Sequence, residues 1–341
     1  MERGEFMKHA AIVGCGNIAE IHANALSQLP GINITAVADV DITKAGHLSY
    51  KYTDNTAKVY KNITVMLSSE DINVLHICTP HYLHVPMAVE GLKSGKDIFM
   101  EKPPAISLKE FEYLKETVKK SNHHIGFCFQ NRYNQAVMAL DTIVESKSLG
   151  SLIGSRAFVT WRRDKAYYSD GWHGILSKEG GGVLINQSIH TLDLMLRYLG
   201  TPKVITASMN NHHLSGITEV EDTLEAWMEF ADGKRACFYA SNAYANDAPV
   251  ILELTFDDGW VTMTGNTLTI FKNGTSPKVQ TFNPESRNSI GRSYWGTSHL
   301  ACIEDFYSHL SDSTGYQNDI TGIENTMKTV IRIYEAAGKQ Y

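Results

Sequence analysis

The chain has 341 residues, of which 43% are hydrophobic and 20% are charged, and its formal net charge is -6. This length suits two domains, and the composition is that of an ordinary globular protein. The acidic balance, without a run of Lys and Arg, argues against a nucleic-acid partner, and no apolar stretch reaches the roughly 20 residues that span a bilayer.

Residues 1–6 lack the apolar region of an export signal, so the analysis of the fold starts at Met7. The five cysteines are widely spaced and include no CxxC pair: Cys15, Cys78, Cys128, Cys237 and Cys302. This pattern favours reduced thiols over a disulfide framework or a zinc cluster. We therefore expect a cytoplasmic protein.

The first third of the chain alternates short apolar runs with helical patterns. The runs predict strands at 9–14, 33–38, 73–79, 97–101 and 124–129, and the patterns predict helices at 17–29, from 42, at 83–94 and at 108–121. Short strands that are apolar on both sides and separated by helices indicate a parallel sheet covered on both faces. The prediction is a doubly wound α/β domain of the Rossmann type over residues 7–128.

After about residue 150 strand-like runs follow one another, separated by Asp232-Gly233, Asp258-Gly259 and Asn273-Gly274. Such dipeptides favour tight hairpin turns. We predict strands at 224–231, 235–241, 250–256, 260–264 and 267–271, with helices at 187–199, 298–310 and 323–337. Residues 129–341 should therefore form an α+β domain with a large, open, mainly antiparallel sheet, whose final helix is expected to pack back toward the first domain.

A glycine-rich GxGxxA segment, Gly14-Cys15-Gly16-Asn17-Ile18-Ala19, joins the first predicted strand to the first helix. Gly14 allows a tight turn, Gly16 lets the backbone approach a pyrophosphate, and Ala19 permits close helix–strand packing. The helix start, with Asn17 and Ile18, would then face the anion. At the start of a βαβ unit, this motif predicts a dinucleotide site.

Asp39 ends the second predicted strand, 23 residues after Gly16. A carboxylate there can accept hydrogen bonds from the adenosine ribose, although a solvated strand-end Asp is the alternative. The next residue is Val40 rather than an arginine that could bind a 2′-phosphate. We therefore expect NAD as the cofactor in preference to NADP.

Three further segments carry a family resemblance: Thr79-Pro80 with His84, Glu101-Lys102-Pro103, and the glycine run at 180–182 that leads to His190 and Asp193. With the glycine loop, they make the chain resemble the Gfo/Idh/MocA oxidoreductases along nearly its full length. The resemblance implies that Thr79, Pro80, His84, Glu101 and Lys102 contact the cofactor. It also implies hydride transfer between nicotinamide and a hydroxyl-bearing carbon of a cyclic sugar, a sugar derivative or a cyclitol.

The resemblance implies that Lys102 and His190 act on the reacting hydroxyl of the substrate. The Lys102 ammonium can hydrogen-bond to the hydroxyl, and an imidazole near neutrality suits a proton acceptor. A surface lysine and a packed histidine are the alternatives. The peptide bond from Lys102 to Pro103 is expected to be cis, as it often is in the family.

Asn186 departs from the family pattern, because many relatives have an aspartate four residues before the histidine. An amide cannot take up a proton as a carboxylate can. Asn186 is therefore expected to position a substrate hydroxyl, which leaves proton transfer to His190 with help from Lys102.

Weaker candidates for the sugar pocket are polar and aromatic residues: Arg132, Trp161, Arg163, Tyr167, Trp172, His173, Asp193 and His299. Asp193 could instead orient the histidine or simply pack. No HxxxH or HExxH spacing supports a metal at His173, His190, Asp193 and His299, so none is expected. Ser188 lacks the context of a nucleophile.

Two other functions stay open at this point. A protein that senses NAD and a sugar without catalysis would need the fold but not both Lys102 and His190, and the scaffold could also reduce a non-sugar diol or carbonyl. Relatives pair subunits through the sheet of the second domain. Trp227, Phe230 and Tyr239 are expected on its open face, so a homodimer or homotetramer is predicted.

Overall fold

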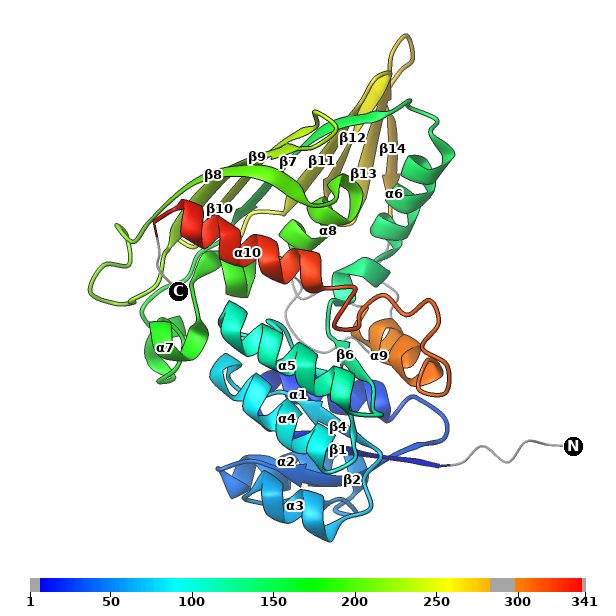
Figure 1. Cartoon of the computed structure of the whole chain (residues 1–341), viewed down its shortest axis with the longest axis vertical. Coiled ribbons are helices and arrows are strands. Elements are labelled where there is room, and N and C mark those ends of the chain that lie inside the picture. Colours follow the sequence, from blue (N-terminus) through cyan, green and yellow to red (C-terminus); the bar gives the residue numbers. More distant parts are fainter. Residues whose placement is uncertain (1–6, 283–297, 339–341) are drawn as a thin grey trace, which may run out of the picture. The chain divides into compact units, whose positions relative to one another are not determined.

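The computed structural model describes residues 7–282 and 298–338 and divides the chain into two compact units (Figure 1). Within the described part, the first unit holds residues 7–105, 109–130 and 298–323. The second unit holds residues 106–108, 131–282 and 324–338.

The first unit is built on a six-stranded parallel sheet with the order β3-β2-β1-β4-β5-β6. Its strands are β1 (Lys8–Val13), β2 (Ile32–Ala38), β3 (Lys58–Tyr60), β4 (Val74–Ile77), β5 (Asp97–Met100) and β6 (Ile125–Phe127). Its helices are α1 (Asn17–Leu26), α2 (Ile42–Thr53), α3 (Ile63–Ser69), α4 (His84–Lys93), α5 (Leu108–Lys120) and α9 (His299–Ser308). All four residues of β4 are buried, as expected for a strand covered on both faces. The predicted Rossmann fold is confirmed.

The second unit is built on an eight-stranded sheet with the order β14-β13-β12-β11-β7-β10-β9-β8. The strands are β7 (Leu152–Thr160), β8 (Pro202–Asn210), β9 (Thr223–Phe230), β10 (Arg235–Ser241), β11 (Ile251–Phe256), β12 (Gly259–Thr264), β13 (Thr267–Lys272) and β14 (Lys278–Thr281). Neighbouring strands run antiparallel except β7 and β10. The predicted mainly antiparallel sheet is therefore confirmed, with one parallel pair inside it.

Helices cover one face of this sheet. They are α6 (Gln135–Ser146), α8 (Ile189–Leu199) and α10 (Glu324–Ala336), and Figure 1 shows them on the same side of the strands. A short helix, α7 (Leu176–Glu179), and a buried π-helical turn at Val183–Gln187 precede α8. Helix α8 packs on β7, while α10 packs on α8 and β8.

The other face of the sheet exposes apolar side chains. Burial alternates along β9, so Trp227 is 61% exposed whereas Phe230, three residues later, is only 5% exposed. The register places Tyr239 opposite Glu225 and Cys237 opposite Trp227, so Tyr239 shares the face of Trp227. The expectation for Phe230 is therefore wrong, because an odd spacing moves its side chain to the helix-covered face.

The units do not follow the predicted boundary at residue 128. Helix α9 belongs to the first unit, where it packs against α1, although the sequence boundary assigned it to the second domain. Helix α10 belongs to the second unit. All five cysteines are unpaired, as predicted, and no helix in the described ranges is long and apolar enough to cross a membrane.

Candidate active site

The glycine loop lies at the point where the strand order reverses. Strands β1 and β4 are neighbours, and the chain builds the sheet outward from them in opposite directions. Ligands of open α/β sheets bind at the carboxyl ends of strands at such a point. Gly14 follows β1 with φ of 82°, and a Cβ there would lie 2.7 Å from the Cys78 carbonyl oxygen. A Cβ on Gly16 would meet no atom within 4 Å, which leaves the space that a pyrophosphate needs.

Asp39 lies directly behind this loop. Its Oδ2 accepts a hydrogen bond of 2.7 Å from the Cys15 amide, and its Oδ1 accepts one of 2.8 Å from the Asp41 amide. The carboxylate therefore holds the loop and the start of α2 in place. Asp39 is partly exposed beside the 82% exposed Val40, so its carboxylate is accessible from solvent.

The turn after β4 contains a buried hydroxyl that fits a bound ligand. Thr79 Oγ1 is buried and has no hydrogen-bond partner among the described residues. A buried polar atom without a partner is costly, so a ligand group there would relieve the cost. His84 is fully buried, and its ring nitrogens lie 2.8 Å from the carbonyl oxygens of Thr79 and Pro103. It thereby links the turns that follow β4 and β5.

Lys102 follows β5, one strand further from the glycine loop, and its bond to Pro103 is cis, as predicted. Its backbone amide donates to Oε2 of the buried Glu101 at 3.2 Å. Burial by itself raises the pKa of Glu101. The hydrogen bond from His22, and the charges that His22, His299 and Lys102 carry when they are protonated, outweigh burial and bring that pKa below its usual value. Glu101 is therefore an anion beside the Lys102 ammonium.

Glu101 ends a buried chain of hydrogen bonds. His22 Nε2 lies 3.0 Å from Glu101 Oε1, His22 Nδ1 lies 2.9 Å from His76 Nδ1, and His76 Nε2 lies 3.0 Å from the Tyr307 hydroxyl. Ligand atoms of His22, Glu101 and Cys128 also lie within 4.8 Å of one another. Because both His22 nitrogens already have hydrogen-bond partners, this series of hydrogen bonds explains why His22 and Glu101 lie together, and no metal ion is needed to explain it.

Buried histidines with lowered pKa values make the stability of the protein sensitive to acid. Burial lowers the pKa of His299 to about 4, despite the opposing charge of Glu101, and burial also lowers the pKa of His76 and His84. The unfolded chain therefore binds more protons than the folded one below pH 6.5, so stability falls as the pH falls from about 6.5 toward 4.

For His299 alone, the unfolding free energy should fall by about 2 kcal/mol between pH 7.5 and pH 5. Urea unfolding of wild type and His299→Gln at both pH values measures it. The variant should lose less unfolding free energy than wild type on acidification, and an equal loss would rule out His299 as the titrating group.

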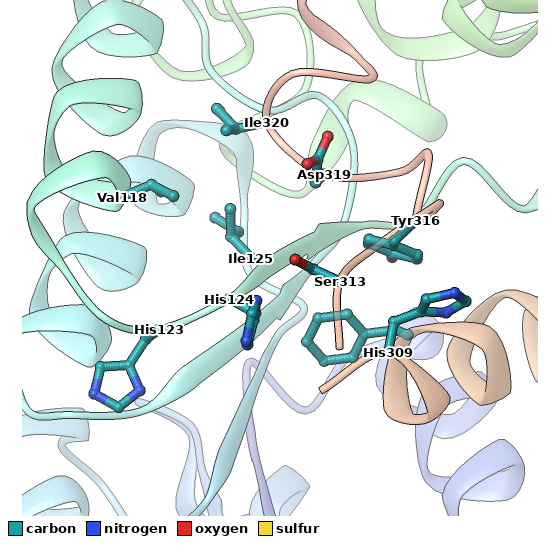
Figure 2. Close-up of a pocket in the computed structure, with 10 residues that line it drawn as sticks. Val118, His123, His124, Ile125, His309, Ser313, Tyr316, Asp319 and Ile320 are labelled. Carbon is teal, nitrogen blue, oxygen red and sulfur yellow. The ribbon is translucent and has the colours of Figure 1, made fainter. Parts of the chain in front are cut away.

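A separate pocket lies at the opposite edge of the parallel sheet. Its volume is about 80 Å³, and it is lined by His123, His124 and Ile125 at the start of β6, and by residues from 306–320 (Figure 2). In Figure 2 the His309 and Tyr316 rings lie across the pocket from His123. The amino ends of the strands lie here, so this pocket is not the cofactor site.

In the second unit, the glycine run positions the turn that carries Asn186. A Cβ on Gly181 would lie 2.1 Å from Tyr334 Oη, and one on Gly182 would lie 2.0 Å from the Glu221 carbonyl oxygen. The buried Glu221 carboxylate accepts hydrogen bonds from the amides of Gly182 and Leu184 and from the Tyr334 hydroxyl. Only glycine allows this close packing of the turn.

Asn186 and Gln187 belong to a polar network inside the second unit. Asn186 Nδ2 donates to Glu179 Oε1 at 2.6 Å and to Tyr167 Oη at 3.3 Å. Gln187 Nε2 donates to the same Tyr167 oxygen at 3.0 Å, and Gln187 Oε1 accepts from Asn242 at 3.0 Å. His190 lies in the first turn of α8, which follows this network, and is partly exposed.

Several predicted pocket residues cluster around Tyr167. Its ring centroid lies 4.5 Å from that of His173, whose ring in turn lies 3.6 Å from Trp172. The Arg163 guanidinium lies over the rings of Trp161 and Tyr167, and it forms an ion pair with Asp247 at 3.0 Å. Aromatic faces with hydrogen-bonding groups at their edges suit a polyhydroxylated ring.

Arg132 and Asp193 bind each other. Arg132 Nε lies 2.8 Å from Asp193 Oδ2, Arg132 Nη2 lies 2.6 Å from Asp193 Oδ1, and both side chains are buried. Thr326 of α10 also donates to Asp193 at 2.7 Å. This arrangement ties α8 to α10 and gives Asp193 a packing role next to its predicted substrate role.

The structure therefore groups the predicted residues in two sets. Those expected to bind the cofactor, with Lys102, surround the carboxyl ends of β1, β2, β4 and β5. Asn186, Tyr167, Trp172 and His173 form a second set in the other unit. Glu179 and Glu221 could not be predicted from the sequence, because no spacing rule links a lone glutamate to a partner that only the fold brings near.

Two family models match the chain in the order that the fold requires. One is described as "Oxidoreductase family, NAD-binding Rossmann fold" and matches residues 8–127. The other is the Gfo/Idh/MocA C-terminal domain and matches residues 137–262. The chain belongs to the Gfo/Idh/MocA oxidoreductase family.

Relatives in this family act on sugars and cyclitols. The chain is 27% identical over 241 residues to D-glucoside 3-dehydrogenase of Escherichia coli (strain K12), a match that covers 65% of this chain and 67% of the enzyme. It is 26% identical to the NAD⁺-dependent scyllo-inositol 2-dehydrogenase of Bacillus subtilis (strain 168), over 71% and 70% of the two chains. It is 27% identical to glucose-6-phosphate 3-dehydrogenase of the same organism, but that match spans only 60% of the enzyme.

Several solved structures with the same fold were determined with NAD⁺ or NADH bound. An oxidoreductase from Agrobacterium radiobacter in complex with NAD⁺, L-tartaric acid and magnesium superposes with a TM-score of 0.87 at 17% identity, covering 98% of this chain and 97% of the other. Levoglucosan dehydrogenase with NADH and levoglucosan gives a TM-score of 0.84 at 18% identity, covering 97% of each chain. At these identities the likeness establishes the fold. The cofactor, NAD, follows from the family model, which describes an NAD-binding Rossmann fold.

Proposed function

We propose that this protein is an NAD-dependent dehydrogenase that oxidises one hydroxyl-bearing carbon of a cyclic sugar, a sugar derivative or a cyclitol. The observation that carries the proposal is the position of Lys102, which follows β5 on the edge of the sheet that holds the glycine loop and Thr79. Bound NAD⁺ would accept the hydride from the substrate carbon.

The cofactor would be held by groups at the switch point of the sheet. The open space at Gly16 and the start of α1 with Asn17 and Ile18 suit the pyrophosphate. Asp39 suits the ribose. Thr79, in the same turn as Pro80, supplies a buried hydroxyl. His84 and Glu101 support this site from behind rather than opening into solvent.

The protein's own part is to hold the alcohol and accept its proton. In this proposal the Lys102 ammonium donates a hydrogen bond to the reacting hydroxyl oxygen, which favours loss of the proton. The His190 imidazole accepts that proton as the hydride leaves. Asn186 accepts a hydrogen bond from a neighbouring hydroxyl, and the aromatic cluster around Tyr167 packs against the ring.

A panel of substrates tests the proposal. Purified protein with NAD⁺ is mixed with levoglucosan, scyllo-inositol, glucose 6-phosphate and a methyl glucoside, and NADH is followed by absorbance. At least one of these compounds should support sustained NADH formation. Tight NAD⁺ binding without turnover of any polyol would favour a sensing protein instead.

We further propose that the protein pairs subunits through the open face of its second sheet. Trp227, Trp260 and Val279 are exposed there by 61%, 37% and 63%, which is unusual for large apolar groups on a strand face. Light scattering should give the mass of a dimer or tetramer at micromolar concentration, whereas a monomer mass would contradict the pairing. The cytoplasmic location stays a prediction.

A further inference from the structure

Glu179 is a fully buried carboxylate at the end of α7, seven residues before Asn186. Gly180 follows it with φ of 84°, and this turns the chain into the glycine run. One Glu179 oxygen accepts a hydrogen bond from the Gly174 amide, and the other accepts the 2.6 Å bond from Asn186 Nδ2. A buried charge persists only where such donors surround it.

This contact decides which end of the Asn186 amide faces which partner. An ionised carboxylate can only accept hydrogen bonds, so Asn186 must turn its NH₂ group toward Glu179. The same nitrogen lies 3.3 Å from the Tyr167 hydroxyl. Both amide hydrogens are therefore directed into this network, and the carbonyl oxygen Oδ1 is the acceptor end of the side chain.

The side-chain amide of the next residue, Gln187, also forms hydrogen bonds within this network. Gln187 Nε2 donates to the Tyr167 hydroxyl, and Asn242 Nδ2 donates to Gln187 Oε1 at 3.0 Å and to the Tyr168 hydroxyl at 3.2 Å. Each of these amides thus donates to a neighbour in the network. Glu179 ends this series with an acceptor that cannot reverse.

We propose that Glu179 is a positioning residue that fixes Asn186 with its carbonyl oxygen as the acceptor for a substrate hydroxyl; this inference rests on the function proposed above. The pair divides between two residues what a single aspartate would do. Asn186 supplies the acceptor, and Glu179 supplies a negative charge that does not touch the substrate. Because the amide oxygen takes up no proton, proton transfer is left to His190 and Lys102.

Exchanging the two residues tests this proposal. Glu179→Gln puts two amides together, and each can then donate or accept, so the direction of Asn186 is no longer fixed. The KM of the Glu179→Gln variant for the polyol should rise about 10-fold, which corresponds to the loss of one hydrogen bond, with a smaller change in kcat. Asn186→Asp puts two carboxylates 2.6 Å apart, so one of them must bind a proton near neutral pH.

The double variant Glu179→Gln/Asn186→Asp restores one donor and one acceptor, but the amide at position 179 now donates and the carboxylate at position 186 accepts. Its KM should return to within about 3-fold of wild type, because the hydrogen bond is regained, and kcat/KM should gain one new ionisation from the carboxylate at position 186. The matched control is Glu219→Gln, since the exposed Glu219 accepts from the Leu176 amide at the other end of α7. This control should behave as wild type.

The outcomes separate the two proposals. A wild-type protein that oxidises no polyol in the panel overturns the proposed function, and the positioning role with it. An active wild type in which Glu179→Gln leaves KM unchanged, or in which the double variant is as impaired as the product of its singles, overturns the positioning role alone. Thermal unfolding of the wild type, the two single variants and the double variant provides a further check. Coupling between the two substitutions in melting temperature, without coupling in KM, would make the pair purely structural and would contradict the proposal.

Discussion

Replacing Lys102 with alanine is expected to lower kcat/KM for the polyol by about 10²–10⁴-fold, the usual contribution of one general acid–base group. The ammonium is the cation beside Glu101 at the carboxyl end of β5, and the proposed reaction needs it against the substrate oxygen. Steady-state NADH formation measures this loss. NAD⁺ affinity should change little, because Gly16, Asp39 and Thr79 are untouched.

Lys96→Ala is the matched control for this variant. Lys96 precedes β5 and therefore lies at the amino end of the same strand, away from the glycine loop. Its removal should leave kcat/KM within about 2-fold of wild type, as for a surface substitution. If Lys102→Ala were as active as Lys96→Ala, Lys102 would have no part in the chemistry.

Replacing Asp193 with alanine is expected to destabilise the protein by about 3–5 kcal/mol, because the Arg132 guanidinium would stay buried without its bidentate partner. The Thr326 hydroxyl would lose its acceptor as well. Urea unfolding measures the loss of free energy. Unchanged stability together with a raised KM would instead assign Asp193 to the substrate alone.

Two variants sharpen this result. Arg197→Ala, on the same helix α8, removes the ion pair with Asp141, but that pair is partly exposed, so its loss should cost only about 1 kcal/mol. Arg132→Met/Asp193→Leu removes both buried charges and should regain much of the stability lost in Asp193→Ala. A double variant as unstable as Asp193→Ala would show that the ion pair itself is not the cause.

Much of the first unit could be predicted because local patterns and long-range structure agree there. Strands β1, β2 and β5 are apolar runs between helices, and the glycine loop has a spacing with one mechanical purpose. Strand β3 and helix α3 were not predicted from the sequence. Strand β3 has only three residues, none of them buried, so no apolar run marks it.

In the second unit the hairpins were predicted but their neighbours were not. The dipeptide turns located β9 to β13 to within a residue or two, whereas β7 and β8 lack such turns. The parallel pairing of β7 with β10 joins residues about 80 positions apart, which no local pattern reports. The placement of α9 in the first unit is unpredictable for the same reason.

The site residues divide in the same way. Motifs pointed to Lys102, His190 and Asn186 as candidates, because each stands in a fixed spacing. Glu179 and Glu221 hold the turn that carries Asn186, yet they act through contacts that only folding creates. The partners that orient a functional group are therefore the part of a site that sequence patterns miss.

A crystal structure with NADH and the polyol that the protein oxidises best would test the central proposal most directly. Lys102 Nζ and one nitrogen of His190 should both lie about 2.6–3.2 Å from the same hydroxyl oxygen, on the carbon that faces the nicotinamide ring. Finding the two side chains on different hydroxyls, or either one away from the substrate, would contradict the account.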